Sequence, residues 1–460
     1  MEFVKDAAED AYDRLIYPSL EREMRAALTD RADEGAIGQF ALNLKPLLMQ
    51  PPVKGKVTMG LDPGYRMGCK VAVVDGTGKV LDTAVVYPTY GERQKNEAIA
   101  ALSKLIAKHG VEHIAIGNGT ASRETEQMAV ELIRQVNEAG AHVSYMIVSE
   151  AGASVYSASK LAAEEFPQYD VNLRSAVSIA RRLQDPLAEL VKIDPKAIGV
   201  GQYQHDMPQK RLDETLSGVV EDCVNAVGVD LNTASAPLLS YVAGLNNTTA
   251  RNIVKYREEN GAFTTRKGVL KVPKLGPKAY LNAAGFLRIA GGKNPLDATS
   301  VHPESYEVAT AVLERAGVKA SELSRGGVPD IERRLGSISA LASDLDCGTL
   351  TLIDIVNELK KPGRDPRDDA PEVVFSRSAL SIDDLEPGME LKGTVRNVVD
   401  FGAFVDVGVH QDGLVHISKL ANRFVKHPSD VVRVGDTVKV WVEKVDRDRK
   451  KISLTMVQGK

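Results

Sequence analysis

The sequence is poor in cysteine and in long apolar runs, and each shortage excludes a class of protein. Three cysteines, far apart in 460 residues, provide neither a disulfide framework nor a zinc knuckle. They indicate a reducing compartment, and we expect the cytoplasm. No apolar run approaches eighteen residues, so no membrane span is predicted. The N-terminal residues are charged and helical in pattern, unlike a signal peptide.

The chain also has no overall basic excess, because its formal charge is −4, but one stretch departs from this balance. Residues 239–293 contain ten Lys or Arg and two acids, a local net charge of +8. A field this positive on an acidic protein indicates a polyanionic partner.

Two glycine-containing turns divide the basic stretch into similar halves. Residues 242–246 (VAGLN) and 272–278 (VPKLGPK) each precede apolar residues at helical spacing. Glycine in such a turn lets backbone amides approach a phosphate closely. We interpret 239–293 as tandem helix-hairpin-helix motifs that bind nucleic-acid backbone without reading bases; a plain helical hairpin with a solvated face is the alternative. The expected contacts are Gly244, Asn246, Lys274, Gly276 and Lys278.

Residues 56–195 are predicted to form an α/β domain. Three strands follow one another at 56–62, 70–75 and 80–87, and helices then alternate with strands at 113–116 and 142–148. This order is typical of the RNase H-like fold and does not fit a purely alternating Rossmann order.

An acid at the end of the first strand raises the question of catalysis. The run GLDPG, which contains Asp62, resembles the opening of RuvC-like and YqgF-like nucleases, whose carboxylates hold two Mg²⁺ or Mn²⁺ ions. Asn118 stands where a second acid is expected, which leaves Glu150 and Asp185 as the other candidates. A scaffold without catalysis or bound metal is one interpretation. A metal-dependent nuclease or resolvase using these three acids is the other.

The remaining boundaries follow from composition and periodicity. Residues 1–52 are predicted to form a helical arm, 196–238 a helical connector and 294–362 a small helical module. The Pro- and charge-rich segment 363–384 is predicted to be a linker.

Five short strands separated by Gly and Asp turns at 385–457 predict a small OB barrel. Strict alternation would put Phe401 and Phe404 on opposite faces, and a bulge at Gly402 would bring both rings to one face. Two exposed rings would stack unpaired bases, worth roughly 1–3 kcal/mol per base; the alternative places both in the core. The other surface candidates are His416, Lys392, Arg396, Arg449 and Lys450.

Several runs together resemble a known family. GTVRNVVDFGAFVDVGVHQDGLVHIS resembles an S1 RNA-binding domain. With GLDPGYRMGCKVAVVD, QDPLAELVKIDPKAIGVGQYQHDM, VGVDLNTAS and NPLDATSVHPESY, essentially the whole chain resembles the Tex family of bacterial transcription accessory proteins. The base-contacting positions of S1 domains then fall on Phe401, Phe404, His416 and Asp446, with a basic residue at Arg449 or Lys450.

The resemblance implies a function in transcription. It implies YqgF-like, helix-hairpin-helix and S1 domains that bind RNA and DNA, single strands above all, with RNA polymerase or other transcription machinery as a candidate partner. Tex proteins usually begin with a further helical region, so we expect a C-terminal fragment or a shortened member. A ribosome-associated RNA-binding protein is a further alternative, since S1 domains occur there too.

Overall fold

The computed structural model describes residues 2–369, 385–409, 412–433, 435–447, 449 and 451–457. By its internal contacts the chain separates into two compact units, which we describe one at a time. One contains residues 1–53 and 150–370, and the other contains residues 54–149 and 371–460. Among the described residues, no helix combines the length and the apolar character that crossing a membrane requires.

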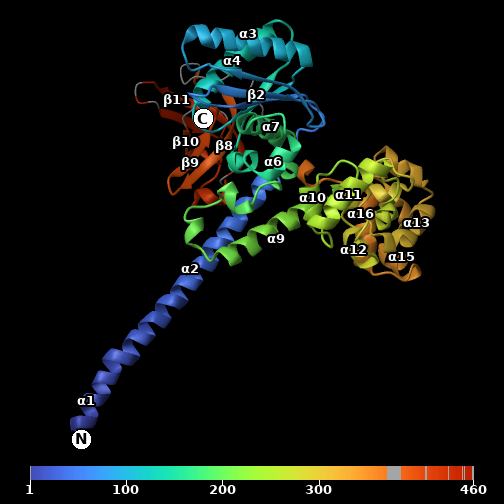
Figure 1. The fold of residues 1–460 in the computed structure, drawn as a ribbon, viewed down its shortest axis with the longest axis horizontal. Helices are drawn as coiled ribbons and strands as arrows, with labels where there is room; N and C mark the ends of the chain where they lie inside the picture. Colours follow the sequence, from blue (N-terminus) through green and yellow to red (C-terminus); the bar gives the residue numbers. More distant parts are fainter. Residues whose placement is uncertain are drawn as a thin grey trace. The chain divides into compact units, whose positions relative to one another are not determined.

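The first part of the unit 54–149 and 371–460 is a five-stranded mixed sheet. Its order is β3-β2-β1-β4-β5; β1 pairs antiparallel with β2 and parallel with β4. Helices α3 and α4 cover one face (Figure 1), where Leu102 and Leu132 join the core. The predicted RNase H-like order is confirmed. The elements are β1 (Thr58–Asp62), β2 (Cys69–Val74), β3 (Val80–Val86), α3 (Glu92–His109), β4 (His113–Gly117), α4 (Ser122–Glu138) and β5 (Ser144–Val148).

The second part of this unit is the predicted five-stranded barrel. It closes in the order β10-β12-β11-β8-β9 around alternating apolar residues such as Val405, Val415 and Leu454. Alternation works here because successive side chains of a strand point to opposite faces. The strands are β8 (Glu390–Val399), β9 (Gly402–Asp406), β10 (Gly413–His416), β11 (Thr437–Asp446) and β12 (Lys451–Thr455).

The other unit begins with a long helical arm. Helix α1 (Glu2–Ala11) leads through a π-helical turn (Tyr12–Ile16) into α2 (Tyr17–Leu48). Pro18 lies in the first turn of α2, directly after the π-helical turn, and a proline inside such a continuous helical run removes one backbone hydrogen bond. Only the C-terminal part of α2 is buried, through Phe40 and Leu44 among others, against α8 and α9.

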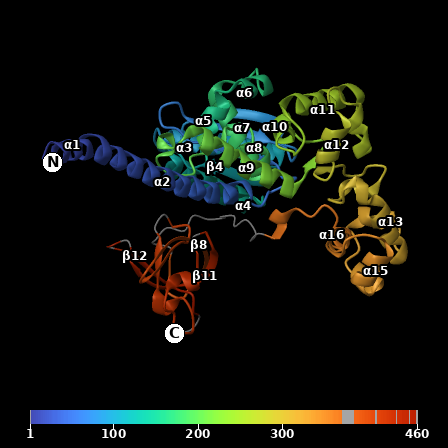
Figure 2. The same cartoon turned by 90° about the horizontal axis from the view of Figure 1, so that it is seen from below.

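Short helices complete this unit, and they have two cores. The core that α2 joins extends through α11 and α12. Helices α13 to α16 share a separate core that includes Leu313 and Leu352, and Figure 2 shows α13, α15 and α16 grouped together. The bounds are α5 (Ala153–Ser157), α6 (Lys160–Glu165), α7 (Val171–Gln184), α8 (Pro186–Leu190), α9 (Gln209–Val227), β6 (Val229–Asp230), α10 (Ala236–Ser240), α11 (Asn247–Asn260), α12 (Pro277–Ala283), β7 (Leu287–Arg288), α13 (Tyr306–Arg315), α14 (Ile331–Leu335), α15 (Ile338–Asp344) and α16 (Thr349–Lys360).

The two predicted hairpin turns have the same backbone. In the first, between α10 and α11, Leu245 N–H donates to the Val242 carbonyl at 2.9 Å. In the second, which leads into α12, Leu275 N–H donates to the Val272 carbonyl at 3.2 Å. The second half differs in one respect, because a 3₁₀ helix at 266–271 takes the place of the expected first α-helix.

The turns use different residues for the left-handed position, and this corrects part of the prediction. Gly244 has φ of +83° in the first turn, but in the second the corresponding residue is Lys274, with φ of +66°. Gly276 has φ of −85° and is the N-cap of α12. A Cβ on Gly244 would lie 2.7 Å from Cβ of Asn282, whereas one on Gly276 would meet open space. The backbone therefore requires glycine at 244 and not at 276.

Serine substitutions at the two glycines should have opposite outcomes. Gly244→Ser should lower the free energy of unfolding by about 1–3 kcal/mol, because the new Cβ meets α12 at a positive φ. Gly276→Ser should stay within about 0.5 kcal/mol, because serine is a good N-cap. Denaturant unfolding followed by far-ultraviolet circular dichroism measures both. Equal losses in the two variants would contradict the assignment.

Candidate nucleic-acid interface

Two phenylalanine rings meet on the outside of the barrel. Phe401 lies in the turn before β9 and Phe404 lies on β9. Their ring centroids are 6.3 Å apart with an interplanar angle of 85°, an edge-to-face contact. Phe401 is 51% exposed and Phe404 is half-buried, so the alternative that places both rings in the core does not hold.

The rings do not meet by the predicted route. The expected bulge at Gly402 is absent from the described β8–β9 pairing, whose irregularity falls in β8 between Val395 and Asn397. Phe401 reaches Phe404 because it precedes the strand and is free of its alternation. Gly402 has another role: a Cβ there would overlap the Val415 carbonyl of the neighbouring strand.

His416 belongs to the same surface. In the β9–β10 ladder Leu414 pairs with Phe404 and His416 pairs with Gly402. His416 is two residues beyond Leu414 and therefore lies on the face that carries Phe404. Its exposed ring holds Nδ1 2.9 Å from the Ser418 hydroxyl oxygen. We call Phe401, Phe404 and His416 the ring surface.

Of the other predicted S1 residues, Asp446 and Lys392 lie apart from the ring surface, whereas Arg396 lies beside it, in the irregular part of β8 opposite Phe404. Asp446 accepts a hydrogen bond from the Arg449 backbone amide at 3.0 Å, in the turn beside the start of β10. His416 ends β10, about 10 Å away along this strand. Arg396 is ion-paired with Asp406 at 2.6 Å, and exposed Lys392 lies opposite Lys439. Lys450 lies outside the described residues.

The ten cations of the basic stretch divide into two groups. Arg257, Arg266 and Arg288 are part of the fold. Arg266, fully buried, donates to the Val301 carbonyl at 2.7 Å. Burial and the nearby charge of Arg266 lower the pKa of Arg288 to about 10. The seven exposed cations are Arg251, Lys255, Lys267, Lys271, Lys274, Lys278 and Lys293.

The two hairpin turns also differ in how open they are to a ligand. The Asn246 side chain accepts hydrogen bonds from the amides of Thr248 and Thr249, at 2.9 and 3.0 Å. Its oxygen is thus engaged in capping α11, which does not favour the predicted phosphate contact. Gly276 has no side chain to cap α12, and exposed Lys274 and Lys278 flank it. The second turn therefore presents two exposed cations and no side chain that caps the helix.

The candidate acid Asp62 faces a cation of the chain. Lys70 is its direct partner across the β1–β2 ladder, so both side chains lie on one face of the sheet. The Lys70 ammonium donates to the carbonyls of Met67 and Gly68, at 2.6 and 2.9 Å. The Lys70 ammonium is thus bound by backbone carbonyls, on the face of the sheet that carries Asp62.

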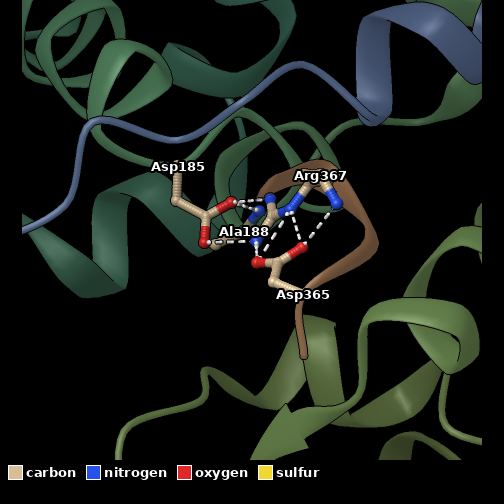
Figure 3. A network of polar contacts seen from close by, with 4 residues as sticks. All are labelled: Asp185, Ala188, Asp365 and Arg367. Atoms are coloured by element: carbon tan, nitrogen blue, oxygen red, sulfur yellow. Dashed lines mark hydrogen bonds and ion pairs between the residues drawn. The ribbon is translucent and has the colours of Figure 1, made fainter. Parts of the chain in front are cut away.

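Asp185 is held by an arginine far away in the sequence (Figure 3). Its carboxylate caps α8 through the Ala188 amide and pairs with Arg367 at 2.7 Å. Arg367, which is 2% exposed, also donates to Asp365 at 2.8 Å. Burial alone would lower the pKa of Arg367, but hydrogen bonds to Asp365 and Asp185 raise it.

This contact corrects the predicted start of the linker. Residues 366–369 form a 3₁₀ helix that is fixed through buried Arg367. Proline and charge suggested a solvated linker from residue 363, but the charges here are paired inside the fold. Residues 370–384 lie outside the described part of the chain.

Glu150 also lies in the field of an arginine. Burial lowers the pKa of Arg182, and the charges of Glu189 and Glu150 oppose this shift. Arg182 donates to the Ala151 carbonyl at 2.8 Å. Across the described ranges, no three His, Cys, Asp or Glu side chains gather as a metal site would need. Of the three candidate acids, Asp185 pairs with Arg367 and caps a helix, so these residues do not fit a shared two-metal arrangement.

Comparisons with known proteins match this architecture domain by domain. Residues 56–184 match the Tex protein YqgF-like domain, and residues 224–288 match a helix-hairpin-helix motif. Residues 384–456 match the S1 RNA binding domain. Residues 294–367 match an HHH domain, and this is the segment for which the sequence predicts only a small helical module. Together these domains define a multidomain chain of nucleic-acid-binding type.

Long relatives cover almost the whole chain. The chain is 57% identical over 454 residues to the transcriptional accessory protein Tex of Neisseria gonorrhoeae, and the match covers 99% of this chain and 59% of that protein. It is 55% identical over 448 residues to protein tex of Bordetella pertussis, with 96% and 55% covered. The uncharacterized protein YdcI of Bacillus subtilis is 55% identical over 457 residues, with 99% and 63% covered. The chain belongs to the Tex family, and it spans about three fifths of the length of these relatives.

Removing the Arg367 guanidinium should destabilise the helical unit strongly. Arg367→Met leaves Asp365 and Asp185 without their cation, which should lower the free energy of unfolding by about 3–5 kcal/mol. Arg364→Met is the matched control, because Arg364 pairs with Asp369 at the surface, and its change should stay within about 0.5 kcal/mol. Denaturant unfolding compares the two variants. A loss no larger at 367 than at 364 would count against the buried triad.

Proposed function

We propose that this chain is a nucleic-acid-binding transcription accessory factor of the Tex type. The observation that carries the proposal is the ring surface, where exposed Phe401 and half-buried Phe404 stand beside His416. Aromatic rings on the outside of an OB barrel stack unpaired bases, and every base offers a face to stack on. RNA and other single strands are the ligands that this surface fits, largely without sequence preference.

The second hairpin turn supplies a different kind of contact. Lys274 and Lys278 are exposed on either side of Gly276, and five further exposed cations belong to the same basic stretch. Cations arranged around a backbone turn bind phosphates and do not read bases. We therefore propose that the barrel selects single strands and that the hairpins add affinity for any nucleic-acid backbone.

We propose a scaffold role for the YqgF-like domain. Arg367 pairs with Asp185, so this candidate acid has a structural partner within the chain. We further propose that the factor works in the cytoplasm and contacts RNA polymerase or other transcription machinery. The names of two relatives, a transcriptional accessory protein Tex and a protein tex, support the link to transcription. Co-purification with RNA polymerase, as opposed to ribosomes, tests this partner.

Loss of both rings should weaken binding without changing its salt dependence. Phe401→Ala with Phe404→Ala removes two stacking contacts, each worth roughly 1–3 kcal/mol, so the affinity for single-stranded RNA should fall by about thirtyfold or more. The slope of log affinity against log salt should stay the same, since no phosphate contact is lost. Fluorescence anisotropy at several salt concentrations measures both quantities. An unchanged affinity would refute the ring surface as the base-binding site.

Loss of the hairpin lysines should have the complementary effect. Lys274→Ala with Lys278→Ala should reduce the salt slope for single-stranded RNA by about 1.4, because each lost phosphate contact changes it by about 0.7. Lys79→Ala with Lys104→Ala is the matched control, since both lysines are exposed on the YqgF-like domain, and its slope should equal that of the unaltered chain. Equal slopes in the two double variants would remove the hairpin from the interface.

A further inference from the structure

Phe424 is exposed in a way that the fold does not explain. It is 92% exposed, more than any other large apolar side chain in the described ranges. It lies in the loop between β10 and β11, residues 417–436, and none of the S1 positions considered so far includes it. A fully solvated phenylalanine gains nothing from burial in the free protein, so its ring is available to a ligand.

The loop that carries Phe424 is anchored on the barrel. Leu420 and Val432, on either side of Phe424, are each 2% exposed and belong to the barrel core. Val425, the next residue, is 9% exposed. The Met456 amide also donates to the Lys419 carbonyl at 2.9 Å. The ring is thus held outward by a loop whose neighbouring apolar residues are buried.

Positive charge surrounds the exposed ring. The run Arg423–His427 reads RFVKH and contains no acid. Arg423 and Lys426 are exposed, and among the residues that the structure describes neither is ion-paired. Lys419 in the same loop differs, because it pairs with Glu443 at 2.7 Å. An aromatic ring between two uncompensated cations matches the chemistry of a base between two phosphates.

The loop continues from the ring surface. The Ile417 amide, at the start of the loop, donates to the Phe401 carbonyl at 2.8 Å. His416, the last residue of β10, belongs to the ring surface and directly precedes the loop. Phe424 therefore follows His416 along the chain by eight residues, on a loop that leaves the barrel at the end where Phe401 lies.

We propose that Phe424 is a third stacking position for the same single strand. An unpaired base of RNA stacks on its ring, and Arg423 and Lys426 contact the flanking phosphates. This inference rests on the proposed function of the ring surface, which it extends by at least one nucleotide. The charge around the ring favours a nucleic acid over a protein partner, because an apolar protein contact would have to desolvate both cations.

RNAs of two lengths distinguish the ring surface from the proposed position at Phe424. Phe424→Ala should weaken binding of an RNA of about twelve nucleotides by roughly five- to hundredfold, since one stacking contact is lost. An RNA of about three nucleotides should occupy the ring surface alone, so its affinity should change less than twofold. Phe3→Ala is the matched control, because Phe3 is 85% exposed on α1, and it should leave both affinities unchanged.

A spectroscopic readout tests the stacking itself. The chain has one tryptophan, Trp441, so Phe424→Trp in a Trp441→Phe background places a single fluorophore in the loop. Its emission should be quenched by the longer RNA, and the affinity for that RNA should be retained. Unaltered thermal unfolding of Phe424→Ala would show that the barrel is intact.

The outcomes distinguish this inference from the function on which it rests. If the Phe401 and Phe404 double variant loses RNA binding while Phe424→Ala does not, and the emission of the Phe424→Trp variant is not quenched, the third position is refuted and the ring surface stands. If neither alanine variant loses affinity, both are refuted. If Phe424→Ala keeps its RNA affinity but captures less RNA polymerase, the loop is a protein contact and the inference is overturned.

Discussion

A guanidinium inside a protein must find hydrogen-bond acceptors for its donors, and this constraint organises the helical unit. Arg266, fully buried, donates to carbonyls and a tyrosine hydroxyl beyond the hairpin region, so it joins the hairpins to the segment that follows them. Arg367 does the same at the end of that unit by pairing with Asp365 and Asp185. Because an unpaired buried charge costs several kcal/mol, each contact fixes the segments on both sides of it.

The same constraint decides which charges remain for a ligand. Cations that are buried or half-buried, such as Arg257 and Arg288, cannot contribute fully to binding a polyanion. Exposed lysines such as Lys274 and Lys278 can. The same applies to an acid: Asp185 is neutralised by Arg367 of the chain and needs no metal ion as a partner. The surfaces proposed for binding therefore consist of exposed cations and rings, while Asp185 is engaged within the fold.

Local patterns in the sequence were sufficient for the fold and for much of the ring surface. The succession of strands, helices and turns along the sequence predicts both β domains, and Phe401 and Phe404 suggest adjacent rings. The predicted reason for their adjacency, a bulge at Gly402, is wrong. The predicted role of Gly276 in the second hairpin turn is also wrong, because the left-handed residue there is Lys274. Asp185 and Arg367 are 182 residues apart, and no periodicity links such a pair. Phe424 carried a basic flanking pattern, but only its solvent exposure singles it out.

The central claim is that binding has a stacking part, which salt does not screen, and a phosphate part, which salt screens. The most direct measurement compares single-stranded RNA with duplex DNA over a range of salt up to about 1 M. The account predicts that duplex binding disappears at high salt, because it depends on counterion release alone, while single-stranded RNA retains a measurable affinity from the rings. The account would be contradicted if the affinities for single-stranded RNA and duplex DNA fell with the same dependence on salt and disappeared together.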